Sequence, residues 1–327
     1  MLLAIIATLL GFVVLIWSAD LFVAGAASIA ENLGVSPAII GLTIVSIGTS
    51  APEILVSLTA AFSGAGELAI GNAIGSNIAN IGLVLGITLL VVPMQVHPDC
   101  VRRELPALLA VTAGVALLIA DGDLSRPDSL AMVAALCLIL YRMMWRRPSG
   151  DVPGAEAEVE AEELPHLASG RAWLTFAIGL LLLIASSRLL VWGATGIATT
   201  LGVSQLVIGL TIVAVGTSLP ELAATVASAL RGHTELAVGN VVGSNLFNLL
   251  MVMAIPGLVQ TEVLDAHILP RDYGSMAALT AMLALAIYLG RYRRRATPGH
   301  AYLGRFAGVL FVGTYALYYY WLYLTTH

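Results

Sequence analysis

A long block of sequence occurs twice in this chain, in the same register and without a gap. Gly48–Glu53 (GTSAPE) returns as Gly216–Glu221 (GTSLPE), and Gly71–Asn80 (GNAIGSNIAN) returns as Gly239–Asn248 (GNVVGSNLFN). Every matched pair lies 168 residues apart (221 − 53). Chance does not preserve one separation over so many positions, so the chain consists of one unit that has been duplicated.

The composition places both copies in a membrane. Of the 327 residues, 59% are hydrophobic and only 11% are charged, and the mean hydropathy is +0.93. A soluble domain contains about 25% charged residues. The apolar runs are continuous and much longer than the alternating segments of a β-barrel, so they predict membrane-spanning helices.

Each copy of the unit predicts five spans. They lie near residues 2–29, 37–62, 68–92, 105–120 and 128–145 in the first copy, and near 172–198, 205–230, 236–259, 270–290 and 304–324 in the second. Because five is an odd number, the second unit must cross the membrane in the opposite sense. We therefore expect an all-α polytopic membrane protein with ten transmembrane helices, arranged as two inverted five-helix repeats at residues 1–147 and 171–327.

An acidic stretch, residues 148–170, joins the two repeats. Its one aspartate and five glutamates lie among proline, glycine and alanine, a composition typical of a flexible, solvated linker. A calcium sensor is the alternative, but the stretch lacks the glycine-punctuated spacing of a calcium-binding loop. The apolar N-terminus could be a signal peptide. However, no positive charge precedes it and a matching segment recurs in mid-chain, so we expect a retained first helix.

The arginines predict the orientation. All fifteen basic residues are arginine, and Arg188 lies within a span. Twelve lie in or beside the loops of one side: Arg102, Arg103, Arg142, Arg146, Arg147, Arg171, Arg231, Arg291, Arg293, Arg294, Arg295 and Arg305. Only Arg126 and Arg271 fall on the other side. The positive-inside rule then predicts a cytoplasmic central linker with both termini outside. The lack of lysine and the short linker favour a prokaryotic inner (cell) membrane.

Two carboxylates, Glu53 and Glu221, lie deep in predicted spans at equivalent positions of the repeats. Ionisable groups inside a span are costly and are functional candidates by default. The inversion should bring these two together near the centre of the membrane, where they repel each other unless they are protonated or bridged by a cation. A divalent cation would neutralise both.

The neighbouring residues suit a hard cation. Pro52 and Pro220 cannot donate to the carbonyls of Gly48 and Gly216, so we expect the helices to break there and to free backbone oxygens. Hydroxyl and amide side chains follow on the same or the next span: Thr49, Ser50, Thr217, Ser218, Ser76, Asn80, Ser244 and Asn248. Calcium takes about six to eight oxygen ligands of these kinds. Any one of these side chains could instead serve helix packing.

The remaining ionisable groups near the spans have simpler interpretations. Asp20 and Arg188 are related by the repeat, and we expect them to orient or pack their helices or to pair with each other. Glu67 and Glu235 lie at the beginnings of the third and eighth spans. We expect the helix dipole to stabilise their carboxylates there. An ion-entry role is the alternative for both glutamates.

At these motifs the chain resembles the sodium/calcium exchanger branch of the calcium/cation antiporters, over nearly its whole length apart from the linker. The resemblance implies that the second, third, seventh and eighth spans line a cluster of calcium and sodium sites. Glu53 and Glu221 would be calcium ligands. Sodium sites would be lined by Thr49, Ser50, Thr217, Ser218, Ser76 and Ser244, with backbone carbonyls near Ser46 and Ala214. Asn80 matches the amide of the family, whereas known sodium/calcium exchangers carry an aspartate at the position of Asn248.

The expected function is antiport of sodium against calcium by alternating access, with the first and sixth spans sliding against the other eight. A proton/calcium exchanger that titrates Glu53 and Glu221 is the alternative, because Asn248 removes one carboxylate from the family pattern. A channel is disfavoured because no filter-like sequence is present. A hydrolase using Ser50 or Ser218 lacks a base, since all six histidines lie in loops or near the termini.

Other classes of partner find no support in the sequence. Cys100 and Cys137 form neither a CxxC motif nor a Cys/His cluster, so neither a disulfide framework nor a zinc site is predicted. No basic patch is interleaved with aromatic residues, which argues against nucleic acid. We expect no enzyme activity and no cofactor; the partners are Ca²⁺ and Na⁺ as transported ions and the lipid bilayer, and a monomer suffices.

Overall fold

The computed structural model describes residues 1–145, 167–202 and 214–326. Most of the predicted acidic linker and the first part of the predicted seventh span lie outside these ranges.

The first repeat consists of helices and two short strands. Its elements are α1 (Leu2–Leu33), α2 (Pro37–Ile40), η1 (Gly41–Val45), α3 (Ser46–Thr49), α4 (Ala51–Phe62), α5 (Gly66–Ala79), η2 (Asn80–Leu85), α6 (Gly86–Val91), β1 (Met94–Val96), η3 (Cys100–Glu104), α7 (Leu105–Leu118), β2 (Asp123–Leu124) and α8 (Arg126–Trp145). The η segments are π-helical turns that continue the neighbouring α-helices, so several elements in series form one span.

The second repeat follows the same order. Its elements are α9 (Ser169–Thr200), α11 (Ala214–Thr217), α12 (Leu219–Leu230), α13 (Thr234–Phe247), η5 (Asn248–Val252), α14 (Ala254–Val259), β3 (Glu262–Val263), η6 (Ile268–Tyr273), α15 (Gly274–Gly290), β4 (Ala301–Leu303) and α16 (Arg305–Thr326). The ends of the helices agree with the predicted spans to within five residues where the structure describes them.

Several helical units are long and apolar enough to span a membrane. Within the described residues, five continuous helices pass this test: Leu2–Leu33, Gly66–Val91, Ser169–Thr200, Thr234–Val259 and Ile268–Gly290. A sixth span is the bent pair Pro37–Thr49 and Ala51–Phe62. The remaining predicted spans correspond to α7, α8, α12 and α16.

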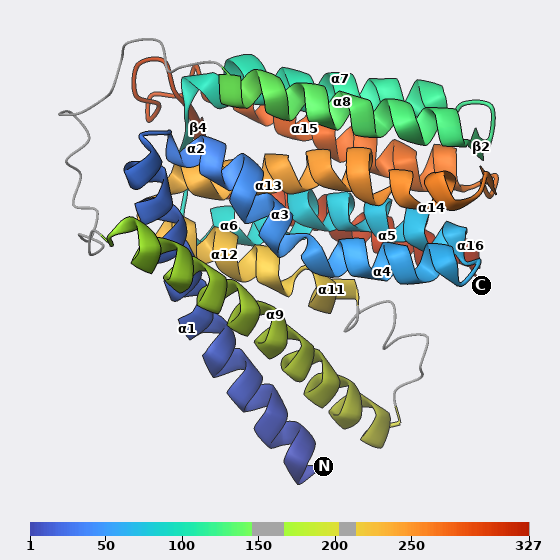
Figure 1. Ribbon diagram of the computed structural model, residues 1–327, viewed down its shortest axis with the longest axis horizontal. Helices are drawn as coiled ribbons and strands as arrows, with labels where there is room; N and C mark the ends of the chain where they lie inside the picture. Colours follow the sequence, from blue (N-terminus) through green and yellow to red (C-terminus); the bar gives the residue numbers. More distant parts are fainter. Residues whose placement is uncertain (146–166, 203–213, 327) are drawn as a thin grey trace.

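Two small antiparallel sheets tie the repeats together at opposite ends of the molecule. At one end β1 pairs with β4, with Met94 opposite Leu303. At the other end β2 pairs with β3, with Asp123 opposite Val263, and Figure 1 shows the two pairs at the two extremes of the long axis. Strand β1 lies 168 residues before β3 (262 − 94), so equivalent loops of the repeats emerge at opposite ends. This is the geometry of an inverted repeat.

The long helices α1 and α9 stand apart from the rest of the bundle. In Figure 1 most helices run roughly along the long axis in stacked layers, whereas α1 and α9 lie side by side, run obliquely to these layers and extend beyond them at the bottom of the view. The large hydrophobic core lies within the other helices and includes Ile78, Leu85 and Leu279. A smaller cluster around Phe22, Phe176 and neighbouring apolar residues packs α1 and α9 together and against α12.

Glycines let the backbones of α1 and α9 approach closely. The contact points form two repeat-related pairs, Gly11 with Gly179 and Gly25 with Gly193. A Cβ atom on Gly25 would lie only 2.5 Å from the backbone nitrogen of Phe176. Small residues at helix crossings are the usual means of close packing in membranes, where no hydrophobic force drives helices together.

This crossing makes a testable prediction for Gly25→Ala. The added methyl group meets backbone atoms that cannot move aside, so the variant should lose about 1–3 kcal/mol of stability. Gly114→Ala in α7 is the control, because its Cβ would meet nothing within 4 Å and alanine favours a helix. Midpoints of thermal unfolding in detergent measure both changes. An unchanged midpoint for Gly25→Ala would show that the two helices do not pack as described.

Candidate cation-binding site

Two broken helices meet in the middle of the molecule. Ser50 separates α3 from α4, with a bend of 45° between the two halves of the span. Ser218 separates α11 from α12 in the same way, and the φ angles at Ser50 and Ser218 are −82° and −91°. Each break lies two residues before a proline, Pro52 or Pro220, that cannot donate a backbone hydrogen bond. The predicted breaks are therefore confirmed for both repeats.

Glu53 and Glu221 occupy the first turns of the helices that start at these breaks. Both side chains are buried, with 1% of their surface exposed. The hydroxyl of Ser50 in the first repeat lies 3.5 Å from Oε1 of Glu221 in the second, and Glu53 follows Ser50 by three residues in the first turn of α4. The inversion thus brings the two carboxylates together, as the sequence predicts. The N-terminal ends of α4 and α12 offer the carboxylates a favourable dipole.

Asparagines on the next helices hold the broken segments in place. The Nδ2 group of Asn72 donates to the carbonyl of Glu53 and to the hydroxyl of Ser57, both at 3.2 Å. Its repeat counterpart, Asn240, donates to the hydroxyl of Thr225 at 3.0 Å. The equivalent partners in both repeats show that this bracing is a conserved feature of the duplicated unit within this chain.

Asn240 also links the two repeats. Its Oδ1 atom accepts a hydrogen bond from the hydroxyl of Thr49 at 3.2 Å, and its backbone carbonyl accepts one from Ser46, also at 3.2 Å. The dipeptide Gly-Asn occurs in both copies of the motif, but its asparagine was not among the predicted site residues. Repetition of a buried amide at both copies was the signal that could have identified Asn72 and Asn240.

A second pair of asparagines meets close to the axis between the repeats. Nδ2 of Asn77 donates to the backbone carbonyl of Asn245 at 3.2 Å, and these two residues are themselves repeat-related. Oδ1 of Asn245 accepts from Nδ2 of Asn80 at 3.2 Å. Asn77 and Asn245, like Asn72 and Asn240, were not among the predicted site residues.

Asn80 and Asn248 each begin a π-helical segment. Asn80 starts η2 and Asn248 starts η5, and both side chains are buried. Such widened turns are rare and occur frequently at functional sites. One turn before them, the buried Ser76 and Ser244 lie on the same two helices, α5 and α13. The structure therefore gathers the predicted serines and asparagines of both repeats around the breaks.

Many of these buried polar atoms have no protein partner. Among the described residues, the unpartnered buried oxygens at this site are both carboxylate oxygens of Glu53, Oε2 of Glu221, the Oδ1 atoms of Asn77, Asn80 and Asn248, and the hydroxyls of Ser218 and Ser244. Buried polar groups are usually hydrogen-bonded, and each unpaired one is costly. These eight oxygens lie at the two breaks and on the helices packed against them, and they form a cradle that could hold an oxygen-seeking cation.

The other predicted site residues lie at the edge of this cradle. Ser46 is buried and donates to the carbonyl of Gly41 at 2.5 Å. Thr217 is half-buried and lines a cavity beside α9. The backbone of Ala214 begins α11, which is the first described turn before the break at Ser218. The packing that positions Ser46 depends on Gly243, where a Cβ would lie 2.5 Å from the carbonyl oxygen of Leu42.

The ionisable residues outside the cradle have other partners. Asp20 does not pair with Arg188: its Oδ1 atom accepts a hydrogen bond from Nε of Arg231 at 2.9 Å. The possibility of a mutual Asp20–Arg188 pair was therefore wrong. Repeat-related residues of an inverted repeat lie toward opposite ends unless they are near its axis, which explains the difference. Glu235 lies in the first turn of α13, as expected, and its Oε1 atom is 3.8 Å from Nε2 of His97.

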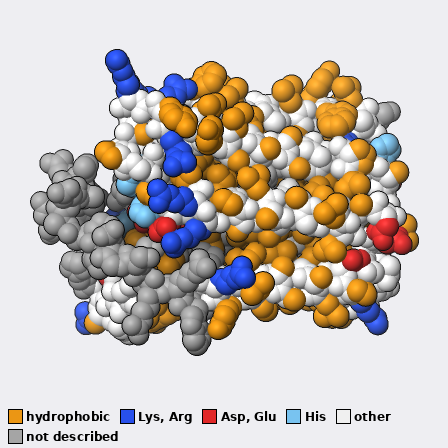
Figure 2. Space-filling model, turned by 90° about the horizontal axis from the view of Figure 1, so that it is seen from above, with side chains coloured by type: hydrophobic (Ala, Val, Ile, Leu, Met, Phe, Trp, Pro, Cys, Tyr) orange, Lys and Arg blue, Asp and Glu red, His pale blue; other side chains and the backbone are white. Residues whose placement is uncertain are grey.

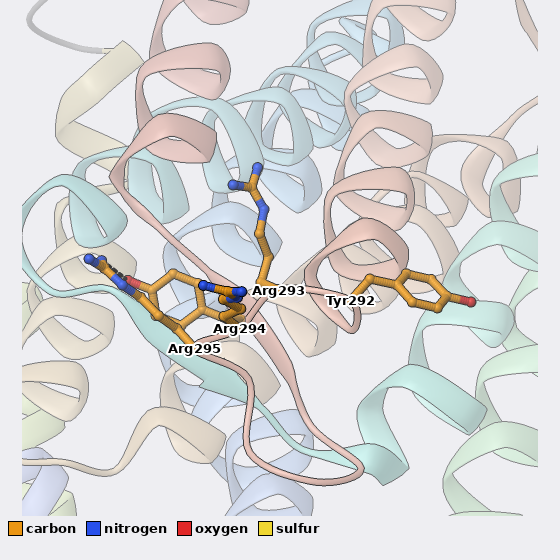
Figure 3. A pocket seen from close by; sticks show the side chains of 5 residues that line it. Tyr292, Arg293, Arg294 and Arg295 are labelled. Carbon is orange, nitrogen blue, oxygen red and sulfur yellow. Dashed lines mark hydrogen bonds between the residues drawn. The ribbon is translucent and has the colours of Figure 1, made fainter.

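A separate cavity of about 370 Å³ lies near strand β4, at the arginine-rich end. Figure 3 shows Arg293, Arg294 and Arg295 around it, and the guanidinium of Arg295 lies 6.0 Å from the ring centre of Tyr302. Its three guanidinium groups repel cations, so this cavity does not compete with the carboxylate cradle as a cation site. Figure 2 shows blue side chains gathered toward one end, beyond a broad apolar surface suited to lipid.

Comparison with known proteins agrees with the fold and the arrangement of the motifs. The profile of the family described as "Sodium/calcium exchanger protein" matches residues 3–145 and 171–324. CaxA of Alkalimonas amylolytica is 47% identical over 296 residues, which cover 90% of this chain and 93% of CaxA. Inner membrane protein YrbG of Escherichia coli is 38% identical over 328 residues and 98% of both chains.

A solved structure gives the same result in three dimensions. The sodium-calcium exchanger NCX_Mj, soaked with Na⁺ and Ca²⁺, superposes with a TM-score of 0.78 at 30% identity and covers 97% of both chains. The predicted fold of ten transmembrane helices is thereby confirmed, as is the prediction of a transporter. The chain is a multi-pass membrane protein that belongs to the sodium/calcium exchanger family of cation/calcium exchangers.

Proposed function

We propose that this chain exchanges Na⁺ for Ca²⁺, with the ions bound between Glu53 and Glu221 at the centre of the membrane. The observation that carries the proposal is the pair of buried carboxylates without a basic partner. Within the described ranges, neither glutamate forms an ion pair with arginine or histidine. Two bare negative charges in a low-dielectric interior require a positive charge from elsewhere, and the transported cation supplies it.

The donor set selects the kind of cation. Carboxylate, amide and hydroxyl oxygens surround the breaks, and calcium prefers about six to eight such ligands in a flexible arrangement. No group of three or more His, Cys, Asp or Glu side chains that could hold a metal is found in the part of the chain that the structure describes. Softer metals favour thiolate and imidazole ligands. The site is therefore suited to hard cations such as Ca²⁺ and Na⁺.

The support for Na⁺ coupling is that hydroxyl and amide groups outnumber carboxylates among the proposed site residues. Sodium needs less compensating charge per ion than calcium, so Ser50, Ser76, Ser244 and Asn248 can serve it. The relative NCX_Mj is named as a sodium-calcium exchanger. Coupling to protons is the second candidate, because Asn248 stands where the family pattern carries an aspartate and leaves two glutamates as the titratable groups of the site.

Alternating access uses the division of the fold seen in Figure 1. Helices α1 and α9 pack on each other through glycines, run obliquely to the rest of the bundle, and contact the broken spans at α3, α11 and α12. Sliding of this pair past the broken spans would expose the site to one side and then to the other. The Asp20–Arg231 ion pair joins α1 to the residue that follows α12, so it breaks or reforms in this movement.

The arginine distribution gives the orientation. The end that holds β1 and β4 carries Arg103 and Arg291–Arg295, while the opposite end carries Arg126 near β2. The positive-inside rule places the first of these ends in the cytoplasm, with both termini outside. The relative YrbG is named as an inner membrane protein, and we assign this chain to the same kind of membrane, with residues 148–170 as the cytoplasmic linker between repeats 1–147 and 171–327.

The first test is uptake of calcium-45 by proteoliposomes. Vesicles loaded with Na⁺ and diluted into Na⁺-free medium should accumulate Ca²⁺, because Na⁺ leaving through the protein drives Ca²⁺ inward. Sodium-free vesicles with an imposed pH gradient are the matched comparison. Uptake driven by the pH gradient alone would replace Na⁺ coupling with proton coupling at the same two glutamates.

The second test addresses the site itself through Glu53→Gln and Glu221→Gln. Each change removes one of two repelling buried charges, so the ion-free variant should unfold at a higher temperature than the wild type. Calcium at about 100 times its Kd should stabilise the wild type by about 2.7 kcal/mol and should leave the variants unchanged. Thermal unfolding with and without Ca²⁺ measures both effects, and uptake should be lost in both variants.

The control for this test is Glu67→Gln. Glu67 also lies in the first turn of a helix, α5, but its side chain is exposed and lies outside the cradle. It should keep both Ca²⁺ uptake and the stabilisation by Ca²⁺. Retained Ca²⁺ uptake in Glu53→Gln would contradict the assignment of the site.

A further inference from the structure

Arg188 is a charged residue in the middle of an apolar helix. It is the twentieth of the 32 residues of α9, about 18 Å along the helix axis from Thr200 at 1.5 Å per residue. Its side chain is exposed on the surface of the protein. In the described part of the chain no acidic side chain lies within ion-pair distance of its guanidinium.

An arginine without an ion-pair partner at this depth in the membrane must be hydrated. Charged side chains within spans almost always face the bundle interior or a water-filled cavity, because exposure to lipid is costly. Arg188 lines a cavity of about 250 Å³ together with Pro52, Val56, Gly216 and Thr217. This volume has room for several water molecules. Most of the lining is apolar, so the guanidinium of Arg188 is the group that would hold water there.

The same cavity lies beside the two helix breaks. Pro52 precedes Glu53 directly, and Thr217 precedes Ser218, the residue at the second helix break. The cavity therefore lies within two residues of each break along the chain, on the side of α9. A cation that approaches the carboxylates by this route passes the fixed positive charge of Arg188.

We propose that Arg188 is a specificity-determining residue at this mouth of the ion pathway, where its charge weakens the apparent affinity for Ca²⁺ more than that for Na⁺. The proposal rests on the proposed location of the site between Glu53 and Glu221. A fixed charge changes the local free energy of an ion in proportion to the charge of that ion. The factor by which Arg188 changes the apparent binding constant of a divalent cation is therefore the square of the factor for a monovalent cation.

The first repeat carries the opposite charge at the position equivalent to Arg188. The counterpart of Arg188 in the first repeat is Asp20, and its charge is balanced by Arg231, with Nε of the arginine 2.9 Å from Oδ1 of the aspartate. Equivalent positions of the two repeats thus carry different charges: a neutralised pair on α1 and an unpaired cation on α9. Apparent affinities measured from the two sides of the membrane should differ accordingly.

The size of the effect follows from Coulomb's law. A unit charge about 10 Å from the ion in water changes the equilibrium for a monovalent cation by about twofold, and for a divalent cation by about fourfold. Arg188→Gln should therefore lower the half-saturating Ca²⁺ concentration for uptake about fourfold, and the half-inhibiting Na⁺ concentration at subsaturating Ca²⁺ about twofold. Added choline chloride should reduce both differences by screening.

Two variants separate charge from shape. Arg188→Lys keeps the charge and should behave like the wild type. Arg103→Gln removes the same charge from an exposed site at the far end and should change neither concentration. Uptake is measured in vesicles with one orientation of the transporter. Equal changes for Ca²⁺ and Na⁺, no change, or a lysine variant that behaves like glutamine would each overturn the proposal.

Labelling tests whether water reaches residue 188. In a Cys137→Ser background, in which the remaining Cys100 is buried, Arg188→Cys is treated with impermeant methanethiosulfonates. A reagent with a trimethylammonium group should restore the weaker Ca²⁺ affinity, and one with a sulfonate group should strengthen it beyond the glutamine variant. Failure of both reagents to label would place Arg188 in lipid and reject the proposal.

These outcomes also separate the inference from the proposed function. If the wild type takes up Ca²⁺ in response to protons and not to Na⁺, the proposed coupling fails. The Ca²⁺ measurements on Arg188→Gln and Arg188→Lys still decide the role of Arg188 in that case. If Glu53→Gln retains uptake, the location of the site fails, whereas an effect of Arg188 on Ca²⁺ affinity would still identify the cavity as part of the pathway.

Discussion

Repulsion between two buried carboxylates is the constraint on which the rest of this structure depends. Glu53 and Glu221 are withdrawn from water at the centre of the fold, and within the described residues neither meets a basic side chain. In a low-dielectric interior such a pair is stable only with a proton or a cation between its members. The helix breaks at Ser50 and Ser218 place both carboxylates in the first turn of a helix, which lowers the cost of the charges but does not remove their repulsion.

The inverted repeat is the means by which one short motif supplies oxygens to the cradle from both halves of the chain. The unpartnered atoms of the cradle come from both copies, for example Asn80 from the first and Asn248 from the second. Close approach of the repeats makes this possible. A Cβ on Gly239 would lie 2.6 Å from the carbonyl oxygen of Ala38, so only glycine lets α13 contact α2 at that distance. The positions of the cradle oxygens therefore depend on glycines at the helix contacts, outside the cradle itself.

The sequence predicts the parts of this site that follow from local chemistry. Proline two residues after Ser50 predicts the break, and a glutamate inside an apolar span predicts function. It does not show that Asn77 donates to the carbonyl of Asn245, because this contact depends on the register between α5 and α13. The strands are also invisible in the sequence, since β2 spans only Asp123–Leu124 and shows no alternation. Long-range packing decides both features.

Symmetry also limits what the duplicated unit can do. Identical inverted repeats would give the two facing states of the transporter equal free energies, so any preference must come from residues that differ between the copies. The Asp20–Arg231 pair is such a difference, because the residue equivalent to Arg231 is Ser63 (231 − 168), which cannot form an ion pair. An ion pair of this partly exposed kind contributes at most about 1 kcal/mol, which corresponds to a bias of about fivefold between the two states. A preference of this size selects a resting state while leaving both states accessible during exchange.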